Sequence, residues 1–243
     1  MAGCPTTGRT TTAEGGTGVQ VAARTEVGLV RGRNEDDLLV DVQRRVFMVA
    51  DGLGGHPSGD VASGLAVRTA QAAVTDEPPR DEAEPGAALG AVLHAAHDAV
   101  LGGAAQDISR RGMGTTAVLA YLSEDDQRLW VAHVGDSRAY LFHAGELRQL
   151  TVDHTIGGRG GGLAQALGTS GAVAPDIVDV DLEPGDRILL CTDGLTDMVD
   201  DDGIAARLGS GEPPQRITDL LVEDALRNGG VDNVTVVVIE AGR

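Results

Sequence analysis

The sequence predicts an α+β fold in which two antiparallel sheets stack on one another and helices cover their outer faces. Short apolar or alternating segments follow one another across tight turns, as they do in antiparallel sheets. Helical patterns come in two pairs, one in the first half of the chain and one near its end. Strands and helices therefore do not alternate one by one, as a parallel α/β fold requires. No internal repeat and no convincing boundary of a second domain is visible.

The first elements of this fold follow a tail. Residues 1–18 are rich in Gly and Thr and carry no period, so we expect them to be disordered. Strands are expected within 19–28 and 37–52, where apolar residues alternate or run together. Ser58 can cap a helix that continues to about Val74. The expected buried face of this helix consists of Val61, Leu65, Ala66, Thr69 and Ala73.

The later elements follow in the same order of helix, strands and helices. A second helix is indicated by apolar residues at helical spacing: Leu89, Val92, Leu93, Ala96 and Val100. Strands are then expected within 115–122, 128–135, 138–145, 147–151, 177–182, 187–194 and 233–241. The residues "AGE" at 144–146 predict a tight hairpin turn. Two helical segments are expected near 204–208 and 214–227.

The composition fits one globular domain with an aliphatic core. The chain has 243 residues, of which 42% are hydrophobic and only 2% aromatic, so Val, Leu, Ile and Ala must fill the core. No apolar run approaches the roughly 18 residues of a membrane span, and the N-terminus lacks a signal-peptide pattern. Cys4 and Cys191 have no nearby cysteine partner, which fits a reducing compartment. We therefore expect a cytoplasmic protein.

The charge of the chain bears on its partners. The formal net charge is −18, and all 19 basic residues are arginine. Such a charge repels nucleic acids and anionic membranes, so we expect neither as a partner. Solubility explains most of the acidic residues. It does not explain acids at the ends of apolar strands, because burying an unpaired carboxylate costs free energy.

Three apolar strands end in an acid next to a glycine. Asp51 precedes Gly52 after "FMVA", Asp193 follows "ILLC" by one residue, and Asp136 comes after "LWVAHVG". A fourth acid, Asp232, stands just before the last strand. Oxygen ligands without histidine or cysteine are those that Mg²⁺ and Mn²⁺ prefer, and a glycine lets the backbone approach a metal closely. We therefore expect a cation as the partner of Asp51.

A further group of polar residues lies near the N-terminus. In "RGRNEDD", Arg31 stands four residues before Glu35 and five before Asp36. If the sheet ends converge, these residues and the acids at the strand ends share one pocket. Two divalent ions about 3.5–4 Å apart, bridged by a carboxylate, form a hydrolytic site.

Together these motifs resemble the metal-dependent serine/threonine protein phosphatases of type 2C, in particular their bacterial branch. The matching segments follow in family order from residue 19 to the C-terminus: "GLVRGRNEDD", "VADGLGGHPSGDVAS", "GTTAVLAYL", "VGDSRAYLF", "LTVDHT", "ALG", "LEPGDRILLCTDGLTDMV" and "DNVTVVVI". The resemblance implies a catalytic domain over 19–243 with a four-layer α-β-β-α sandwich. It also implies a phosphatase that acts on phosphoserine and phosphothreonine.

The resemblance implies metal ligands position by position. Asp51 corresponds to the bridging ligand, and Gly52 offers its carbonyl. Asp193 and Asp232 correspond to ligands of one ion. Asp136, in "GDSR", corresponds to a ligand of the third ion of bacterial relatives, shared with Asp193. The implied cofactors are two core Mn²⁺ or Mg²⁺ ions and a possible third.

The resemblance also implies a direct hydrolysis. Glu35 and Asp36 correspond to acids that hold metal-bound waters, and Asp36 also counts among the metal ligands. Arg31 corresponds to the arginine that grips the substrate phosphate. A water that bridges two ions loses a proton near neutral pH and attacks phosphorus without a covalent enzyme intermediate. The implied partners are proteins that Ser/Thr kinases have phosphorylated. We expect the protein to be a monomer.

Several other polar residues receive structural interpretations. His56 is interpreted as a loop or capping residue, because its spacing from Asp51 differs from that of the acid histidine in some relatives. His154 matches a family motif and is expected to be structural. His94 and His97 are expected on the surface. Ser137 has no visible Ser/His/Asp arrangement, so "GDSR" explains it better than a nucleophile does.

The chain departs from the family between "DHT" and "ALG". Relatives carry a longer helical flap beside the active site, whereas here only "IGGRGGGLAQ" remains, so we expect a shortened flap near 155–165. The arginine usual before "ALG" is absent, and residues 164–166 read Ala-Gln-Ala. The glycine cluster within this segment fails the G-x-G-x-x-G spacing of a nucleotide site, which favours a flexible loop.

Two alternative functions belong to other classes. The first is a catalytically weak regulatory module on the same fold that binds a phosphoprotein. Loss of a ligand would favour it, but Asp36, Asp51, Asp193 and Asp232 are all present. The second is an acidic calcium-binding protein, which the absence of a D-x-[DN]-x-[DN]-G loop disfavours.

Overall fold

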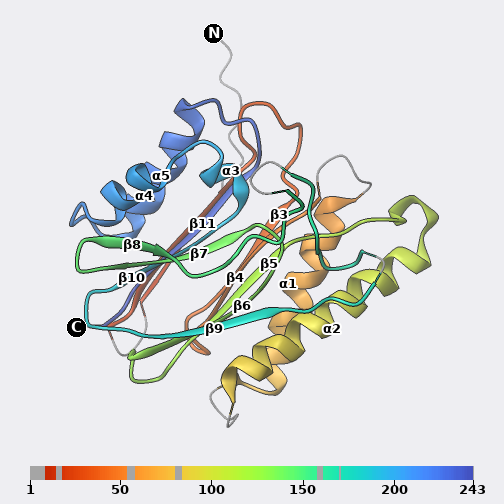
Figure 1. Cartoon of the computed structure of the whole chain (residues 1–243), viewed down its shortest axis with the longest axis horizontal. Coiled ribbons are helices and arrows are strands. Elements are labelled where there is room, and N and C mark those ends of the chain that lie inside the picture. The colour runs from red at the N-terminus through yellow and green to blue at the C-terminus, as the bar shows by residue number, and fades with distance from the viewer. Residues whose placement is uncertain are drawn as a thin grey trace.

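Two antiparallel sheets pack face to face between two layers of helices (Figure 1). The computed structural model describes residues 9–14, 18–53, 58–79, 84–157, 161–169 and 171–242. The first sheet contains, in spatial order, β1 (Arg9–Glu14), β2 (Gln20–Glu26), β11 (Val234–Glu240), β10 (Arg187–Cys191), β7 (Arg138–His143) and β8 (Glu146–Gln149). The second contains β3 (Asp36–Asp41), β4 (Val46–Asp51), β5 (Ala117–Leu122), β6 (Arg128–Val134) and β9 (Asp176–Asp181).

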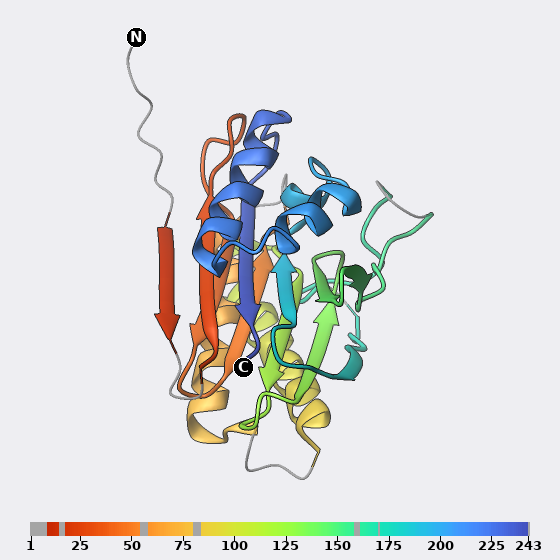
Figure 2. The same cartoon turned by 90° about the vertical axis from the view of Figure 1, so that its left-hand side faces the viewer.

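Each sheet carries its own helices on the outer face. The second sheet is covered by α1 (Gly59–Asp76) and α2 (Pro85–Gln106), and the 3-10 turn η2 (Ile108–Arg110) follows α2. The first sheet is covered by α3 (Asp193–Thr196), α4 (Asp201–Leu208) and α5 (Pro214–Arg227). Figure 2 shows the first sheet from its outer side, with α4 and α5 in front of it and α1 and α2 behind. The predicted four-layer sandwich of two antiparallel sheets flanked by helices is confirmed.

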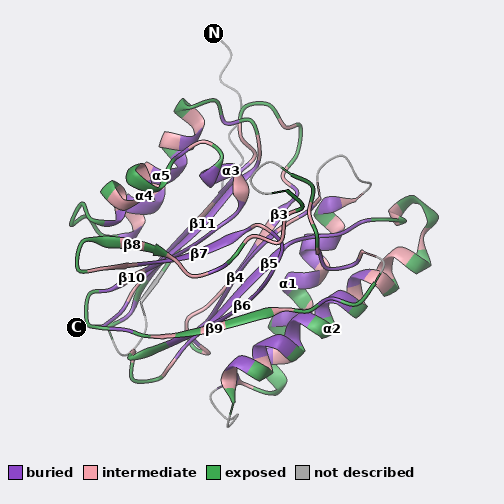
Figure 3. Cartoon of the chain, in the orientation of Figure 1, coloured by how far each residue is buried: buried purple, intermediate pink, exposed green. Residues whose placement is uncertain are grey.

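The central strands are apolar on both sides because both sides are covered. All six residues of β5 are buried, and Figure 3 shows the same for the middle of both sheets, while the edge strands β8 and β9 are largely exposed. In β4, Phe47 and Val49 face the opposite sheet, whereas Met48 and Ala50 face α1 and α2. This alternation follows from the two-residue period of a strand.

The buried face of α1 differs from the expected one. Ala66 is buried as expected, but Val61 and Leu65 lie only partly buried at the border of the cluster. The buried residues of this helix are mostly small, and they include Ala62, Ser63, Ala66, Val67, Ala70 and Val74. Small side chains let a helix approach its neighbours closely, which fits this buried face. Ser58 stands at the N-cap with a φ of 63°, but its side chain makes no capping hydrogen bond.

The expectation of a disordered tail is wrong for residues 9–14. This segment forms β1, which pairs antiparallel with β2 at the edge of the first sheet (Figure 2). Threonine favours extended structure, and the edge of β2 offers unpaired backbone groups. The strand therefore extends the sheet. Within the described ranges, none of the helices has the length and apolarity needed to cross a membrane.

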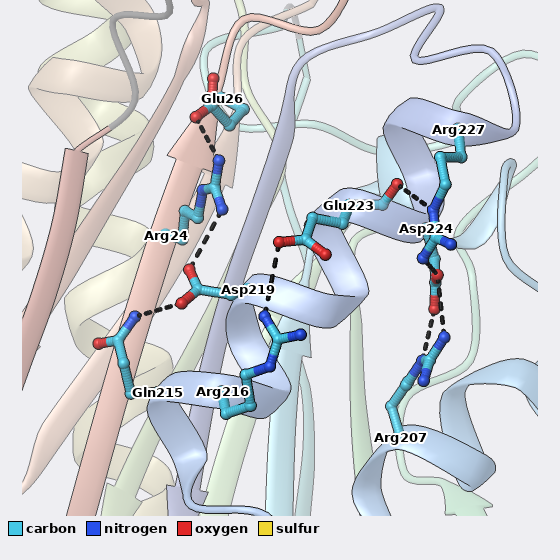
Figure 4. Close-up of polar contacts among 9 residues, drawn as sticks. All are labelled: Arg24, Glu26, Arg207, Gln215, Arg216, Asp219, Glu223, Asp224 and Arg227. Atoms are coloured by element: carbon cyan, nitrogen blue, oxygen red, sulfur yellow. Dashed lines mark hydrogen bonds and ion pairs between the residues drawn. The ribbon is translucent and has the colours of Figure 1, made fainter.

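Arginines fasten α5 to its surroundings (Figure 4). Arg24, on β2, donates to Glu26 over 2.8 Å and to Asp219 of α5 over 3.1 Å. Arg207, on α4, donates to Asp224 of α5 over 2.6 Å. These contacts tie α5 to β2 and to α4, and so hold the helix layer on the first sheet.

Candidate active site

The acids at the strand ends converge on one pocket. The loops before β3 and β11, the loop after β8 and the start of α1 lie at the same end of the sandwich (Figure 1). A pocket of about 470 Å³ opens there, and its lining residues are Arg31, Asp51, Leu53, Thr116, Asp136, Leu163, Ala164, Gln165, Ala166, Thr169, Asp193 and Asp232. Five of the residues singled out from the sequence thus line one cavity.

The position of Asp51 is set by the strand beside it. Its amide donates to the Thr116 hydroxyl over 3.1 Å, and its carbonyl accepts from the Thr116 amide and the Thr115 hydroxyl, each over 2.8 Å. The backbone of Asp51 is therefore held on both sides of the residue. Its side chain projects from the end of β4 into the pocket.

Asp36 lies behind Asp51 and does not line the pocket itself. The two residues are partners in the antiparallel register of β3 and β4. The Oδ2 atom of Asp36 accepts hydrogen bonds from Thr192 over 3.0 Å and from Thr235 over 2.6 Å. These two threonines interrupt apolar segments next to Asp193 and at the start of β11, and they orient the carboxylate.

Two buried carboxylate oxygens in this cluster lack a hydrogen-bond partner. Among the described residues, the Oδ1 atoms of Asp36 and Asp193 are both buried and without one. Buried polar atoms are nearly always paired, and an exception calls for an explanation such as an ion. Carboxylates at the end of three strands, without a histidine or cysteine among them, form a hard-oxygen donor set. The residues present therefore fit divalent cations.

The acids in the cluster disfavour one another's charge. Burial, followed by the charges of Asp193 and Asp232, raises the pKa of Asp36 to about 7. Burial and the charge of Asp136 raise the pKa of Asp193 to about 6. Burial and the charges of Asp36 and Asp193 raise the pKa of Asp51 well above its ordinary value, and burial raises that of Asp136. Like charges in a buried site require either protons or cations.

Glycines permit the close approach of these segments. A Cβ atom on Gly52 would lie 2.3 Å from the carbonyl oxygen of Gly59 and 2.6 Å from that of Glu35. A Cβ atom on Gly194, the second residue of α3, would lie 1.9 Å from the carbonyl oxygen of Asn233. Any side chain at either position would push the acid-bearing segments apart. The short helix α3, which the sequence analysis did not predict, starts at Asp193 itself.

Arg31 lines the pocket and forms an ion pair there. Its Nη2 atom lies 2.6 Å from Oδ2 of Asp232, and this hydrogen bond raises the pKa of the guanidinium. The side chain is 37% exposed, and Asp232 is the partner of only one of its guanidinium nitrogen atoms. Glu35 is buried and its Oε1 atom lies 2.8 Å from Nη2 of Arg33. Glu35 does not line the pocket.

Asn233 joins the loop of Arg31 to the loop of Asp232. Its Oδ1 atom accepts from the Glu35 amide over 2.8 Å, and its Nδ2 atom donates to the carbonyls of Val27 and Arg33 over 2.8 and 2.9 Å. Asn233 was not predicted as a site residue from the sequence. The sequence places this amide directly after Asp232 and at the start of an apolar strand, where a buried polar side chain needs hydrogen-bond partners.

The remaining polar residues near the pocket have structural contacts. Ser137 is buried and its hydroxyl lies 2.7 Å from that of Thr116. His94 is exposed as expected. The expectation for His97 is wrong, because it is buried and its Nδ1 atom accepts from the Gly168 amide over 3.1 Å; a turn far along the chain covers this part of α2. His56 lies outside the described residues.

His133, His154 and Asp176 form a second cluster beside the pocket, with ligand atoms within 4.8 Å of one another. The Gly135 amide donates to Nδ1 of His154 over 3.3 Å, so a neutral ring carries its proton on Nε2. That atom lies 3.2 Å from Oδ2 of Asp176. A protonated Nε2 has no lone pair for a cation. The arrangement ties the loop after β8 to Gly135, next to Asp136.

Residues 155–157 and 161–165, where a shortened flap is predicted, lie beside the pocket. Ile156 donates its amide to the Gly162 carbonyl over 2.8 Å, and Ala164 donates to the His154 carbonyl over 2.7 Å. Residues 163–166 line the pocket, and Gln165 accepts from the Ala174 amide over 2.9 Å. No helix is present in the described part of 155–165. Residues 158–160 of the glycine cluster lie outside the described ranges.

Comparisons with known proteins agree on one family. The model of the family "Stage II sporulation protein E (SpoIIE)" matches residues 41–242. Serine/threonine protein phosphatase PstP of Mycobacterium tuberculosis is 36% identical over 91% of this chain, and this chain spans 45% of that protein. Serine/threonine phosphatase stp of Listeria monocytogenes is 34% identical over 89% of this chain and 94% of its own length.

A solved structure has the same fold. The catalytic domain of the serine/threonine protein phosphatase PstP, in complex with two manganese ions, is 36% identical to this chain and superposes with a TM-score of 0.82. The similarity covers 93% of this chain and 99% of that domain.

Proposed function

This chain belongs to the SpoIIE and type 2C family of bacterial serine/threonine protein phosphatases, and we propose that it hydrolyses phosphoserine and phosphothreonine in proteins with Mn²⁺ or Mg²⁺. The curated relative PstP is about twice as long as the part that this chain matches. The proposal therefore concerns the activity of this domain.

The observation that carries the proposal is a pair of buried carboxylate oxygen atoms without a partner, Oδ1 of Asp36 and Oδ1 of Asp193. They lie beside a pocket that Arg31 lines. Asp51, Asp193 and Asp232 would hold two core cations, with Asp36 behind Asp51. When bound, such cations neutralise a phosphate and activate water for hydrolysis. Asp136, whose charge acts strongly on Asp193, would share a third cation with it.

The other residues of the site act through hydrogen bonds that the protein itself makes or offers. Arg31 faces the pocket with guanidinium nitrogens that are not used by Asp232, and these would orient the phosphate of the substrate through charge-assisted hydrogen bonds. Thr192 and Thr235 hold Asp36 in one orientation. Glu35 carries the carbonyl that fixes the Gly52 amide over 3.0 Å. A role of Glu35 in holding water at the cations remains part of the proposal.

The substrates would be proteins phosphorylated by Ser/Thr kinases, and the protein would act as a cytoplasmic monomer without nucleic-acid or membrane partners. The relatives carry the word phosphatase in their names, which supports phosphoproteins as substrates. Net charge −18 supports the absence of nucleic acid.

The experiment that tests the proposal compares three substrates with the purified protein. A phosphothreonine peptide, a phosphotyrosine peptide and a small aryl phosphate are incubated with Mn²⁺, with and without excess chelator. We expect phosphate release from the phosphothreonine peptide and the aryl phosphate, and none with chelator. Absence of turnover with all three substrates, together with retained binding of the phosphothreonine peptide, would favour the regulatory module.

A further inference from the structure

A second cavity adjoins the candidate active site. It is a groove of about 720 Å³ between the C-terminal end of α2, the turn η2 and residues 168–169. Leu101 and Ala104 of α2 and Ile108 of η2 form its apolar wall, and Arg111 stands at its border. The C-terminal end of α2 reaches the same end of the sandwich as the active-site loops (Figure 1).

The groove and the pocket share one lining residue, Thr169. The turn that carries Thr169 is firmly built. Leu167 exchanges two backbone hydrogen bonds with Thr115, of 2.8 and 3.0 Å, and Thr115 in turn donates to the Asp51 carbonyl. Gly168 has a φ of +83°, and a Cβ atom there would lie 2.1 Å from Val100. The ridge between groove and pocket therefore belongs to the same framework as Asp51.

The apolar wall of the groove includes a side chain that the fold does not use. Ile108 is 83% exposed. Its turn is held by the Asp107 side chain, which accepts from the Ser109 amide over 2.9 Å and from the Ser109 hydroxyl over 2.7 Å. Isoleucine is neither required by this turn nor buried by it. Together with Leu101 and Ala104, Ile108 forms a contiguous apolar surface, and such surfaces mark binding sites more often than single exposed apolar residues do.

The charge at the border of the groove is positive in a strongly acidic protein. Arg111 is exposed and, among the described residues, makes no ion pair. Its neighbour Arg110 instead lies near Asp107, with Nε 3.5 Å from Oδ2. A guanidinium without a partner, next to an apolar wall, is complementary to a segment that carries an acidic and an apolar side chain.

We infer that this groove binds the segment of the phosphoprotein that flanks the phosphorylated residue. A large apolar side chain of that segment would contact Leu101, Ala104 and Ile108, and a carboxylate of it would pair with Arg111. The inference rests on the proposed function, because a phosphorylated residue in the pocket requires its chain to leave past the rim. An extended chain advances about 3.3–3.6 Å per residue, so residues a few positions from the phosphothreonine pass over Thr169.

The test uses phosphothreonine peptides that differ only in their flanks. A reference peptide has Ser and Gly at all flanking positions, and the other peptides carry one Leu and one Asp at two to four positions before or after the phosphothreonine. The specificity constant kcat/KM is measured for each peptide with Mn²⁺. We expect one placement to exceed the reference by about tenfold, the value of one well-buried apolar group or one charge-assisted pair.

Two variants and two controls locate the effect. Ile108→Ser and Arg111→Gln should each remove most of the preference for the favoured peptide, while kcat/KM for the aryl phosphate stays unchanged. Arg110→Gln is the control for charge. Val152→Ser is the control for an exposed apolar residue, because Val152 is 72% exposed and lines neither cavity. Both controls should keep the preference, and all four variants should unfold at the wild-type temperature.

The outcomes separate this inference from the proposed function. Equal rates for all peptides, with normal turnover of the aryl phosphate, would overturn the groove and leave the phosphatase activity intact. A preference that survives in Ile108→Ser and Arg111→Gln would also overturn it. If neither the aryl phosphate nor any phosphothreonine peptide is hydrolysed, the proposed function fails. Fluorescence anisotropy with the labelled peptides then tests the groove alone, since binding that is lost in Ile108→Ser supports it and equal binding contradicts it.

Discussion

Asp36 and Asp51 are directly opposite one another in the antiparallel pair β3–β4. Directly opposed residues in such a pair have Cβ atoms about 4.5–5.5 Å apart, and like charges in this arrangement destabilise the sheet. The pair stands at the end of a sheet whose interior is apolar, so water does not screen the repulsion well. A cation bound between the two carboxylates would attract both, which would explain why two acids lie opposite each other here.

Removal of a charged ligand should greatly weaken metal binding at the core site. Asp193→Asn and Asp232→Ala each delete a carboxylate that lines the pocket. Mutation of residues that hydrogen-bond to metal ligands typically weakens metal binding by roughly 10–100-fold. Isothermal titration should show a larger loss of Mn²⁺ affinity in these two variants, and turnover should nearly vanish. Wild-type affinity in both variants would refute the assignment of these ligands.

The orientation of Asp36 should depend on Thr235. Thr235→Val keeps the shape but removes the hydroxyl that lies 2.6 Å from Oδ2 of Asp36. That hydrogen bond lowers the pKa of Asp36, so the variant should hold its proton more tightly and bind Mn²⁺ about tenfold more weakly. Thr218→Val is the matched control, because Thr218 is equally buried on α5 and bonds to the Pro214 carbonyl. Equal affinities of the two variants would argue against the role of Thr235.

Metal binding should release protons in a defined pH range. The pKa values of about 7 for Asp36 and about 6 for Asp193 lie above the ordinary carboxyl value of 3.8. Between about pH 4 and pH 7 these two carboxyl groups therefore bind more protons in the folded metal-free protein than in the unfolded chain, so their contribution to stability falls as pH rises. Mn²⁺ displaces these protons.

The coupling between proton binding and Mn²⁺ binding can be measured in two ways. Mn²⁺ affinity should increase from pH 5.5 to pH 7.5, and titrations at pH 6 in buffers of different ionisation enthalpy should show net proton release. In thermal unfolding, the metal-free protein should lose stability over the same range, and Mn²⁺ should restore it. An affinity that is independent of pH, without proton release, would contradict the buried acidic cluster.

Arg31 should act on the substrate. Arg31→Ala should raise KM for phosphate esters by about tenfold to a hundredfold, the value of one charge-assisted hydrogen bond. It should not weaken metal binding, because its removal only releases Asp232 from their 2.6 Å contact. Arg33→Ala is the control for a nearby arginine, since Arg33 does not line the pocket. An unchanged KM and unchanged inhibition by inorganic phosphate would rule out Arg31 as the phosphate-binding residue.

Asp136 should affect turnover more than binding of the core cations. Asp136 follows Gly135, whose φ of 108° turns the chain at the end of β6, and it lines the pocket. Asp136→Ala should keep two tightly bound Mn²⁺ ions and lower kcat. With only a short loop over the pocket, wild-type activity should continue to rise with Mn²⁺ after the core sites are filled, and the variant should lack this rise. Identical activation curves and kcat would leave Asp136 a structural role only.

The sequence predicted those features that depend on local pattern. Asp51 and Asp136 follow β4 and β6 of one sheet, and Asp193 follows β10 of the other. All three acids line one pocket, as expected. The helix 214–227 and the apolar face of α2 also agree with the structure. These elements have strong periodicity or a clear change of composition at their ends.

The features that the sequence did not predict depend on distant partners. Thr235 and Thr192 bond to Asp36 across more than 150 positions of the chain, and no local pattern indicates such a contact. The burial of His97 depends on the turn at Gly168, which also lies far along the chain. The buried face of α1 was missed because the helix has small residues on several sides. Residues 9–14 form a strand only because β2 offers its edge.

The central claim is that the acidic cluster around Asp36, Asp51 and Asp193 holds the cations that the hydrolysis requires. The most direct measurement is the rate of phosphate release from a phosphothreonine peptide by chelator-treated protein as Mn²⁺ is added back, with Mn²⁺ bound to the protein determined in the same samples. We expect no turnover without metal and a rise in rate that follows the filling of two sites. Turnover that persists without metal, or two filled sites without turnover, would contradict the claim.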